Sequence, residues 1–398
     1  MKSEEAYRVP GFSANGIHAG IKADGRPDLA LLYSTRPAKI AGVFTTNCFK
    51  AAPVLLDQQR IKKGLAQAVI VNSGCANAAT GEEGFADALA VSKSASQALG
   101  IADDLVMVAS TGVIGHRFPL PKIENSMPRL VTGLREEGIA DAEAGIMTTD
   151  RFPKIALRKG RFGNREVTLC GIAKGAGMIE PNMATMLAFV MTDADIEGEA
   201  LDAVFRRSVA KSFNAITVDG CMSTNDTALI LANGVAGNPP LKKGGKGLSR
   251  FGDLLGDLLG ELARGMVRDG EGATKLIEIT VEEARTLQDA KRVAYAIGNS
   301  NLVKTAFYGG DPNWGRIISA AGSLGIALPV EKVRLFFDGV PLFAQGKGVP
   351  GREKELAAIM QQPEIHLRIA LGMGSRSWTI CASDLTFDYV KINAHYHT

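Results

Sequence analysis

Hydrophobic residues change their spacing along this chain, and the change predicts strands that alternate with helices. Continuous apolar runs at Leu65 to Val71 and at Leu105 to Ala109 are typical of buried strands. Between them, Phe85, Leu89 and Leu99 belong to a predicted helix. The first part of the chain therefore reads as strand, helix, strand.

The second half of the chain shows both spacings in succession. Apolar residues recur at i, i+3 and i+4 from Phe251 to Met266, which predicts an amphipathic helix. Ile277, Ile279 and Val281 then alternate with polar residues, which predicts a half-exposed strand. A later pair of strands is broken at Asp338-Gly339. The chain shows no internal repeat, so the predicted fold class is α/β or α+β, with a largely antiparallel second half.

Glycine and small polar residues gather where strands end. The first apolar run leads into Asn72-Ser73-Gly74, which we expect to turn, and the second leads into a predicted loop over 110–115. Similar concentrations lie at 147–150, 171–185 and 219–227. Loops after strands commonly carry functional groups, so these segments are candidates for one or more sites.

Composition excludes several classes of protein. With 398 residues, 46% of them hydrophobic, the chain can bury a substantial core in roughly two domains. Its net charge of +3, from 45 basic and 42 acidic residues, is too balanced to indicate a nucleic-acid partner. The start lacks a signal-peptide core, and no window approaches 18 consecutive apolar residues, so we expect a soluble, cytoplasmic protein without a membrane partner.

Familiar catalytic and metal-binding patterns are missing from the sequence. The five cysteines show no Cys-x-x-Cys spacing, and His395 and His397 have no third ligand nearby in sequence. Phosphate-binding glycine motifs and a Gly-x-Ser-x-Gly turn are absent, and five histidines offer few bases for a serine triad. We therefore expect no metal and no tightly bound cofactor.

One hydroxyl interrupts the apolar run from Met183 to Phe189, and it belongs to Thr185. Taken alone, such a threonine is a strand or helix residue whose hydroxyl bonds a backbone carbonyl. An enzyme without histidine, metal or nucleotide can still make a nucleophile from a threonine that becomes N-terminal, because its own α-amine accepts the hydroxyl proton. That amine titrates near pH 8, so a useful fraction is neutral at physiological pH.

The segment KGAGMIEPNMATMLAF, Lys174 to Phe189, resembles the self-cleavage and nucleophile segment of the ornithine acetyltransferase (glutamate N-acetyltransferase) family of arginine biosynthesis. Further similar segments follow in order along essentially the whole chain: Phe12 to Lys22, Ser110 to Gly115, Thr148 to Asp150, Glu271 to Thr274, Asp311 to Arg316, and a tail from Ile392 to Thr398. The resemblance implies two mixed α/β domains with the active site between them.

By this resemblance the precursor cleaves itself between Ala184 and Thr185. The Thr185 hydroxyl attacks the carbonyl that precedes it, and hydrolysis of the resulting ester frees the threonine amine. The products are an α chain of residues 1–184, which carries the oxyanion-hole loop and the cleavage segment, and a β chain of residues 185–398, which begins with the nucleophile. The two chains are expected to stay interwoven as a heterotetramer of two copies each.

The implied reaction is a two-step acetyl transfer. Thr185 attacks the acetyl carbonyl of N-acetylornithine, ornithine leaves, and the amine of glutamate takes the acetyl group from the enzyme. Thr111 and Gly112 are the implied oxyanion hole. Acetyl-coenzyme A is the one co-substrate that some family members use, as a second source of acetyl groups for glutamate.

The family pattern also implies which residues contact substrate. They are Thr148, Lys174, Thr185, Glu271, Asn393 and Thr398. Lys174 suits an α-carboxylate and Glu271 suits an ammonium, while the others offer polar contacts to an amino acid.

A few positions depart from the family pattern. They are Cys75 and Ala79, where asparagine and cysteine are usual, Cys221 and Met222, where Asp-Thr is usual, and His395 and His397 in the tail. Cysteine at position 221 replaces the usual aspartate, so this site loop lacks that carboxylate. We expect that difference to change how the ammonium group of a substrate is held. Cys75 is open to interpretation as a nucleophile or, without a nearby histidine in sequence, as a structural residue.

Two other functions remain open from sequence. One is an N-terminal-nucleophile aminopeptidase or amidohydrolase, in which water receives the acyl group. The other is a non-catalytic amino-acid-binding protein of the same fold.

Overall fold

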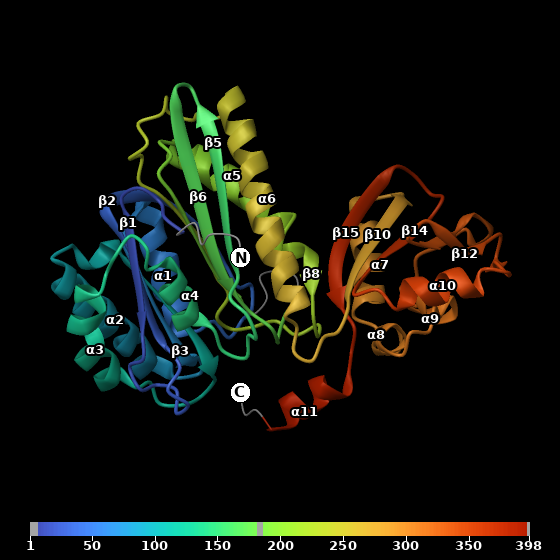
Figure 1. Cartoon of the computed structure of the whole chain (residues 1–398), viewed down its shortest axis with the longest axis horizontal. Helices are drawn as coiled ribbons and strands as arrows, with labels where there is room; N and C mark the ends of the chain where they lie inside the picture. The colour runs from blue at the N-terminus through green and yellow to red at the C-terminus, as the bar shows by residue number, and fades with distance from the viewer. Residues whose placement is uncertain (1–6, 181–185, 396–398) are drawn as a thin grey trace.

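The structure, a computed structural model, describes residues 7–180 and 186–395. Within these residues the strands form two sheets, and each sheet has its own helices (Figure 1). The first body contains most of the chain up to about residue 275, and the second contains the segment that follows it. The final helix lies below both bodies (Figure 1).

The first sheet contains eight strands among the described residues. They are β1 (Phe12–Ile17), β2 (Leu29–Phe44), β3 (Leu65–Cys75), β4 (Val106–Val113), β5 (Ile155–Phe162), β6 (Arg165–Lys174), β7 (Leu187–Thr192) and β9 (Thr227–Ala232). Their order is β4-β3-β2-β9-β7-β6-β5, with β1 paired to β2. The β3–β4 and β7–β9 pairs are parallel and the others are antiparallel.

Helices cover both faces of this sheet. They are α1 (Ala52–Arg60), α2 (Gly81–Leu99), α3 (Leu120–Thr132), α4 (Ile139–Ile146), α5 (Gly198–Ala210) and α6 (Lys246–Arg268). In β7, Ala188 and Val190 join the core that contains the apolar face of α6, while Leu187, Phe189 and Met191 join the core that contains α4. Both faces of β7 are buried, which explains why its sequence is a continuous apolar run.

The second sheet contains seven strands among the described residues, in the order β13-β12-β11-β14-β10-β15-β8. They are β8 (Ile216–Thr217), β10 (Leu276–Ala284), β11 (Arg334–Phe337), β12 (Val340–Ala344), β13 (Lys347–Gly348), β14 (Glu364–Ala370) and β15 (Arg376–Ser383). Its helices are α7 (Leu287–Gly298), α8 (Asn301–Tyr308), α9 (Trp314–Gly322) and α10 (Glu353–Met360), and α11 (Phe387–His395) follows β15. Short 3₁₀ turns lie at Ile61–Lys63, Asp103–Leu105, Phe213–Ala215 and Val330–Lys332.

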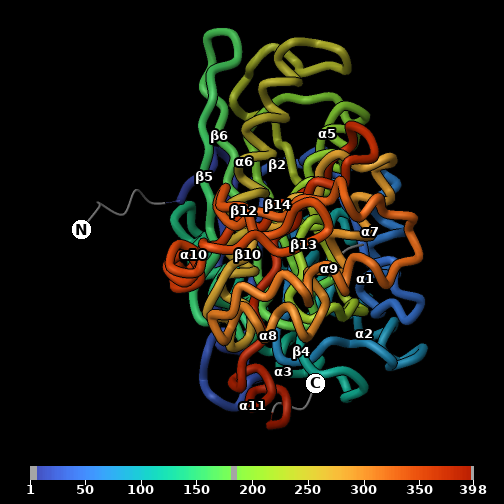
Figure 2. The backbone as a smooth tube through the Cα atoms, turned by 90° about the vertical axis from the view of Figure 1, so that its right-hand side faces the viewer, coloured from blue at the N-terminus to red at the C-terminus, as the bar shows by residue number. Residues whose placement is uncertain are grey.

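Figure 2 views the molecule with this second body in front. The alternation in β10 has the predicted result, because Ile277, Ile279 and Val281 are buried while the residues between them are half-buried. The half-buried face meets the first body at α6, where Arg264 forms ion pairs with Glu278 and Glu364. The bodies therefore meet through charged side chains and through apolar contacts of Leu276 and Cys381 with the core around α6. Strand β8 adds a short strand from the first body's part of the chain to the second sheet.

The predicted class of mixed α and β structure is confirmed, but two local predictions are wrong. Asn72-Ser73-Gly74 does not turn, and β4 continues beyond Ala109 to Val113. The β3–β4 pairing persists because the polar side chains satisfy one another: Ser110 Oγ donates to Asn72 Oδ1 over 2.6 Å. Polar residues at strand ends thus extended the sheet instead of ending it.

No helix in the described ranges combines the length and the apolar character needed to span a bilayer.

Candidate functional site

A pocket lies at the ends of β4 and β6, where α11 returns to the first body. Six residues implied by the sequence line it: Thr111, Gly112, Thr148, Lys174, Glu271 and Asn393. The remaining predicted residues, Ala184, Thr185 and Thr398, lie outside the described residues. Segments separated by up to 282 positions, from Thr111 to Asn393, therefore converge on one site.

Gly112 occupies a position that only glycine fits. Its φ is +130°, and a Cβ built there would lie 2.4 Å from the carbonyl carbon of Gly74 on the neighbouring strand. The adjacent Thr111 is buried, with 4% of its surface exposed. Close backbone approach between β3 and β4 thus fixes the segment that the sequence assigns to the oxyanion hole.

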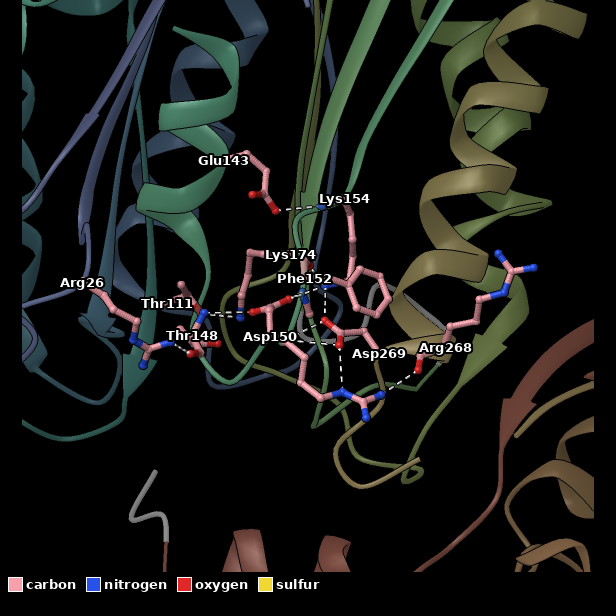
Figure 3. Close-up of polar contacts among 12 residues, drawn as sticks. Arg26, Thr111, Glu143, Thr148, Asp150, Phe152, Lys154, Lys174, Arg268 and Asp269 are labelled. Carbon is pink, nitrogen blue, oxygen red and sulfur yellow. Dashed lines mark hydrogen bonds and ion pairs between the residues drawn. The ribbon is translucent and has the colours of Figure 1, made fainter. Parts of the chain in front are cut away.

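Lys174, the last residue of β6, is buried beside this segment (Figure 3). Its Nζ donates to Thr111 Oγ1 over 3.3 Å. Burial lowers the pKa of Lys174, while the negative charge of Asp150 opposes that shift. The ammonium therefore lies at the predicted oxyanion hole itself, where a developing negative charge would interact with it.

Thr148 is held in place through its backbone. Its N–H donates to Asp150 Oδ2 over 2.8 Å, and its carbonyl accepts a bond from Arg26 over 2.9 Å (Figure 3). Burial alone would raise the pKa of Asp150, but the nearby Lys174 and Lys154 hold it well below the usual range. Asp150 is therefore ionised, and it orients a residue that lines the pocket.

Glu271 contributes the carboxylate on the side of α11. Its N–H donates to the carbonyl of Ala176 over 2.8 Å, and its Oε2 accepts a bond from Asn393 Nδ2 over 2.8 Å. A Cβ on Gly177 would lie 2.4 Å from the Glu271 carboxylate, so the backbone must approach it closely. Two residues from the predicted substrate-binding set are thus in direct contact.

Asp219 is a site residue that the sequence analysis did not identify. Its carboxylate accepts the N–H groups of Met178 and Ile179 over 2.6 and 2.8 Å, and the Tyr389 hydroxyl lies 3.3 Å away. Burial raises the pKa of Asp219. Asp219 directly follows Val218 and begins the 219–227 concentration of polar residues, so the sequence held a signal for Asp219, whereas it held none for Tyr389.

Asn225 and Asp226, which were not identified from the sequence, hold the loop after Asp219 in place. Asn225 Nδ2 donates to the carbonyls of Ala76 and Ser110 over 2.6 and 2.7 Å. Asp226 is fully buried, and its Oδ1 accepts the N–H of Met186 over 2.9 Å. Burial raises the pKa of Asp226 well above the usual range. The chain immediately after the predicted nucleophile is therefore anchored to a buried carboxyl group.

The departures from the family pattern fall in different places. Cys221 is exposed and lines the pocket, so it can affect specificity. Cys75 is buried at the end of β3, and burial raises the pKa of its thiol, which makes a poor nucleophile. His395 ends α11, and His397 lies outside the described residues.

The pocket combines a buried ammonium with carboxylates, which is suited to a small zwitterion such as an amino acid. In residues 7–180 and 186–395 no cluster of three histidine, cysteine or acidic side chains could hold a metal ion. Fold and site together define an α/β protein with a polar pocket where its final helix meets the first body.

Comparison with known proteins assigns the family. The model of the ArgJ family matches residues 13–398, and this chain belongs to that family. The protein named "Arginine biosynthesis bifunctional protein ArgJ" from Geobacter sulfurreducens is 50% identical over 392 residues, covering 98% of this chain and all of the relative. The protein of the same name from Syntrophotalea carbinolica is 48% identical with the same coverage.

A solved structure supports the fold. The crystal structure of arginine biosynthesis bifunctional protein ArgJ from Bacillus halodurans is 38% identical to the matched part, with a TM-score of 0.51. The match covers 52% of this chain and 98% of the solved chain. The predicted family is thus confirmed, and the relatives' shared name agrees with the predicted pathway.

Proposed function

We propose that this protein transfers the acetyl group of N-acetylornithine to glutamate in arginine biosynthesis. The observation that carries the proposal is the placement of Lys174 against Thr111 in a pocket that also holds Glu271. An acyl transfer needs a donor for the developing oxyanion, and an amino-acid substrate needs partners for its charges. This pocket supplies both, and the names of the relatives point to the same pathway.

In the first step the Thr185 hydroxyl attacks the acetyl carbonyl, and its own α-amine takes the proton. The oxyanion forms at Thr111 and Gly112 beside the Lys174 ammonium, and collapse of the intermediate releases ornithine, whose amine takes up the proton. In the second step the amine of glutamate attacks the acetyl ester, and Thr185 leaves as the hydroxyl. Thr148, Lys174, Glu271, Asn393 and Thr398 bind the two amino acids in turn.

The described residues that follow Thr185 in the sequence support it as the nucleophile. The N–H of Met186 donates to Asp226, and Leu187 pairs with Lys174 across β6 and β7. The segment directly after the proposed nucleophile is thus held at the Lys174 end of β6.

We further propose that the chain cleaves itself between Ala184 and Thr185 into fragments 1–184 and 185–398. The sheet order supports stable association, because β7 and β9 of the second fragment lie between β2 and β6 of the first. The matched Bacillus halodurans chain, about half as long as this one, agrees with a two-chain product. The mature protein is then a heterotetramer of two copies of each fragment.

No cofactor takes part in the proposed transfer. Acetyl-coenzyme A is proposed only as a second acetyl donor for glutamate. We place the reaction in the cytoplasm, where both amino acids are available.

Intact mass of the purified protein, before and after incubation with N-acetylornithine, tests the proposal. We expect two fragments, the second beginning Thr-Met-Leu-Ala, and an acetyl adduct on that fragment which glutamate removes. The Thr185→Ala variant should stay whole and inactive, while Thr305→Ala, an exposed threonine of α8, should behave as wild type.

The alternatives predict different results. Release of acetate without formation of N-acetylglutamate would indicate an amidohydrolase. A chain that stays whole while binding ornithine would indicate a binding protein, and either outcome would refute the proposed transfer.

A further inference from the structure

Next to the pocket lies a group of buried charges that no step of the proposed transfer uses. Lys154 has 1% of its side chain exposed, and the carboxylates of Asp150 and Asp269 are fully buried against it. Figure 3 shows these three side chains meeting between β5 and the end of α6. Removing a charged side chain from water costs free energy even when the charge is paired. The presence of three buried charges in one place therefore requires an explanation.

The ammonium of Lys154 uses all of its hydrogen-bonding capacity. It donates to Asp150 Oδ1 over 2.7 Å, to Asp269 Oδ2 over 2.6 Å and to the carbonyl of Phe152 over 3.3 Å. The stem of Lys154 lies near α6, 3.6 Å from the position that a Cβ on Gly265 would occupy. With three donors satisfied, Lys154 is fixed in one position.

The contacts of Lys154 form part of a closed ring. Asp150 Oδ1 also accepts the N–H of Gly175 over 2.8 Å, and the carbonyl of the next residue, Ala176, accepts the N–H of Glu271 over 2.8 Å. Two positions before Glu271 stands Asp269, which returns to Lys154. The ring thus links the loop before β5, the end of β6 and the turn after α6.

Each segment of the ring carries a residue of the pocket. Thr148 is bound through its N–H to Asp150, Lys174 precedes Gly175 directly, and Glu271 is itself a member. The relative positions of these three groups decide whether a zwitterion can reach all of them at once. An error of about 1 Å in such a site can cost roughly a hundredfold in rate.

We propose that Lys154 and Asp269 are positioning residues, whose ion pair closes this ring and fixes Glu271 relative to Lys174 and Thr148 for binding of the amino-acid substrate. The proposal rests on the proposed function for its choice of substrate. Neither residue touches the pocket, so both act through the groups they hold.

A matched pair of double variants tests this role. Lys154→Met with Asp269→Leu removes both partners, so no new unpaired charge is buried between them, and Asp150 keeps Lys174 as a neighbouring cation. The control is Arg158→Met with Glu261→Gln. That pair joins β5 itself to α6, over 2.6 Å, but it is partly exposed and lines no part of the pocket.

We expect the Lys154/Asp269 variant to raise KM for N-acetylornithine by at least about fivefold while kcat falls less than KM rises, because ground-state binding groups are displaced. Calorimetric titration with ornithine should show a Kd weakened by a similar factor. The control variant should keep the wild-type KM, kcat and Kd, and both should unfold within about 5 °C of wild type.

A folded Lys154/Asp269 variant with wild-type KM and ornithine Kd would overturn the proposal. If that variant does not fold, the single change Asp269→Asn decides by the same criteria, and failure of both to fold would assign the pair to overall stability and overturn the positioning role. Wild-type protein that binds ornithine without transferring acetyl would refute the proposed function, yet the Kd comparison would still test the ring.

Discussion

The two bodies of this protein differ in what they bury. The first buries many ionisable side chains, among them Asp28, Asp57, Arg60, Glu143, Asp150, Lys154, Lys174, Asp193, Asp226 and Asp269. In the described part of the second, only Asp289, Lys304 and Asp384 are comparable. Its core of strands β10, β11, β14 and β15 against α7 is apolar. Because burial of ionisable groups costs free energy, their concentration in the first body agrees with the proposed site there.

The second body has a different task. Its sheet pairs β15 with β10, and the chain leaving β15 brings α11 beneath the first body (Figure 1). From there Tyr389 and Asn393 reach Asp219 and Glu271. The second body thus carries the helix whose side chains complete the pocket of the first body.

The sharpest test of this contrast exchanges a buried lysine in each body for methionine. Lys174→Met removes the cation at Thr111, and we expect kcat/KM for acetyl transfer to fall about 10³-fold. Lys304→Met removes a buried lysine that donates to the carbonyl of Ser383, and should cost about 1–3 kcal/mol of stability while leaving kcat/KM nearly unchanged. Steady-state kinetics and thermal unfolding measure both. Equal losses of activity would contradict the division of tasks.

A second comparison uses two glycines with positive φ. Gly112→Ala would place a Cβ 2.4 Å from Gly74 and displace the predicted oxyanion hole, so we expect kcat to fall about 10²-fold. Gly339→Ala, in the β11–β12 turn, meets no atom within 4 Å and adds only backbone strain at φ +85°, about 1 kcal/mol. A Gly112→Ala enzyme with normal kcat would exclude this segment from catalysis.

The buried charges of the first body also predict a dependence of stability on pH. Burial raises the pKa of Glu143 to about 7 from 4.5, so the folded protein holds this proton more tightly than the unfolded chain. Stability should therefore fall as pH rises from about 4.5 to about 7, by on the order of 3 kcal/mol from this group. Denaturant unfolding at pH 5 and 8 should show that Glu143→Gln removes this loss. Glu261→Gln, at an exposed site, should retain the wild-type dependence.

The smallest expected effect compares two carboxylates. Glu271→Gln keeps the size of the side chain but removes its charge, so KM for N-acetylornithine should rise about tenfold, which corresponds to about 1.4 kcal/mol. Glu282→Gln removes a partly exposed ion pair with Arg368 on the second sheet and should change neither KM nor stability by more than about 0.5 kcal/mol. An unchanged KM for Glu271→Gln would remove this residue from the binding set.

The sequence predicted the parts of this molecule that depend on local pattern. The alternating apolar residues of β10 and the apolar stripe of α6 are buried, as predicted. Thr111, Lys174 and Glu271, which were identified from family motifs, line one pocket. Patterns along a chain do not reveal side-chain pairs made across it. Lys154 and Asp269 are 115 positions apart, and β8 has only two residues, so neither the ion pair nor the strand leaves a periodic signal.

Strand ends were the other source of error. Asn72 and Ser110 are polar residues typical of turns, yet their side chains bond each other inside the sheet. A single sequence does not show which polar residues will find such partners. Asp150 and Asp226 lay within the polar segments noted at 147–150 and 219–227, but their roles depend on the backbone N–H groups they accept.

The interleaved order of the first sheet has one more consequence. Strand β9 is hydrogen-bonded to β2, and its neighbour β7 is hydrogen-bonded to β6. A fragment that starts at residue 185 would therefore be hydrogen-bonded on both sides to the fragment that ends at residue 184. Separating the two fragments would require breaking the backbone hydrogen bonds between β2 and β9 and between β6 and β7. Mixing two isotopically labelled batches of mature enzyme should therefore yield no hybrids of old and new halves, because each half keeps the companion with which it was synthesised.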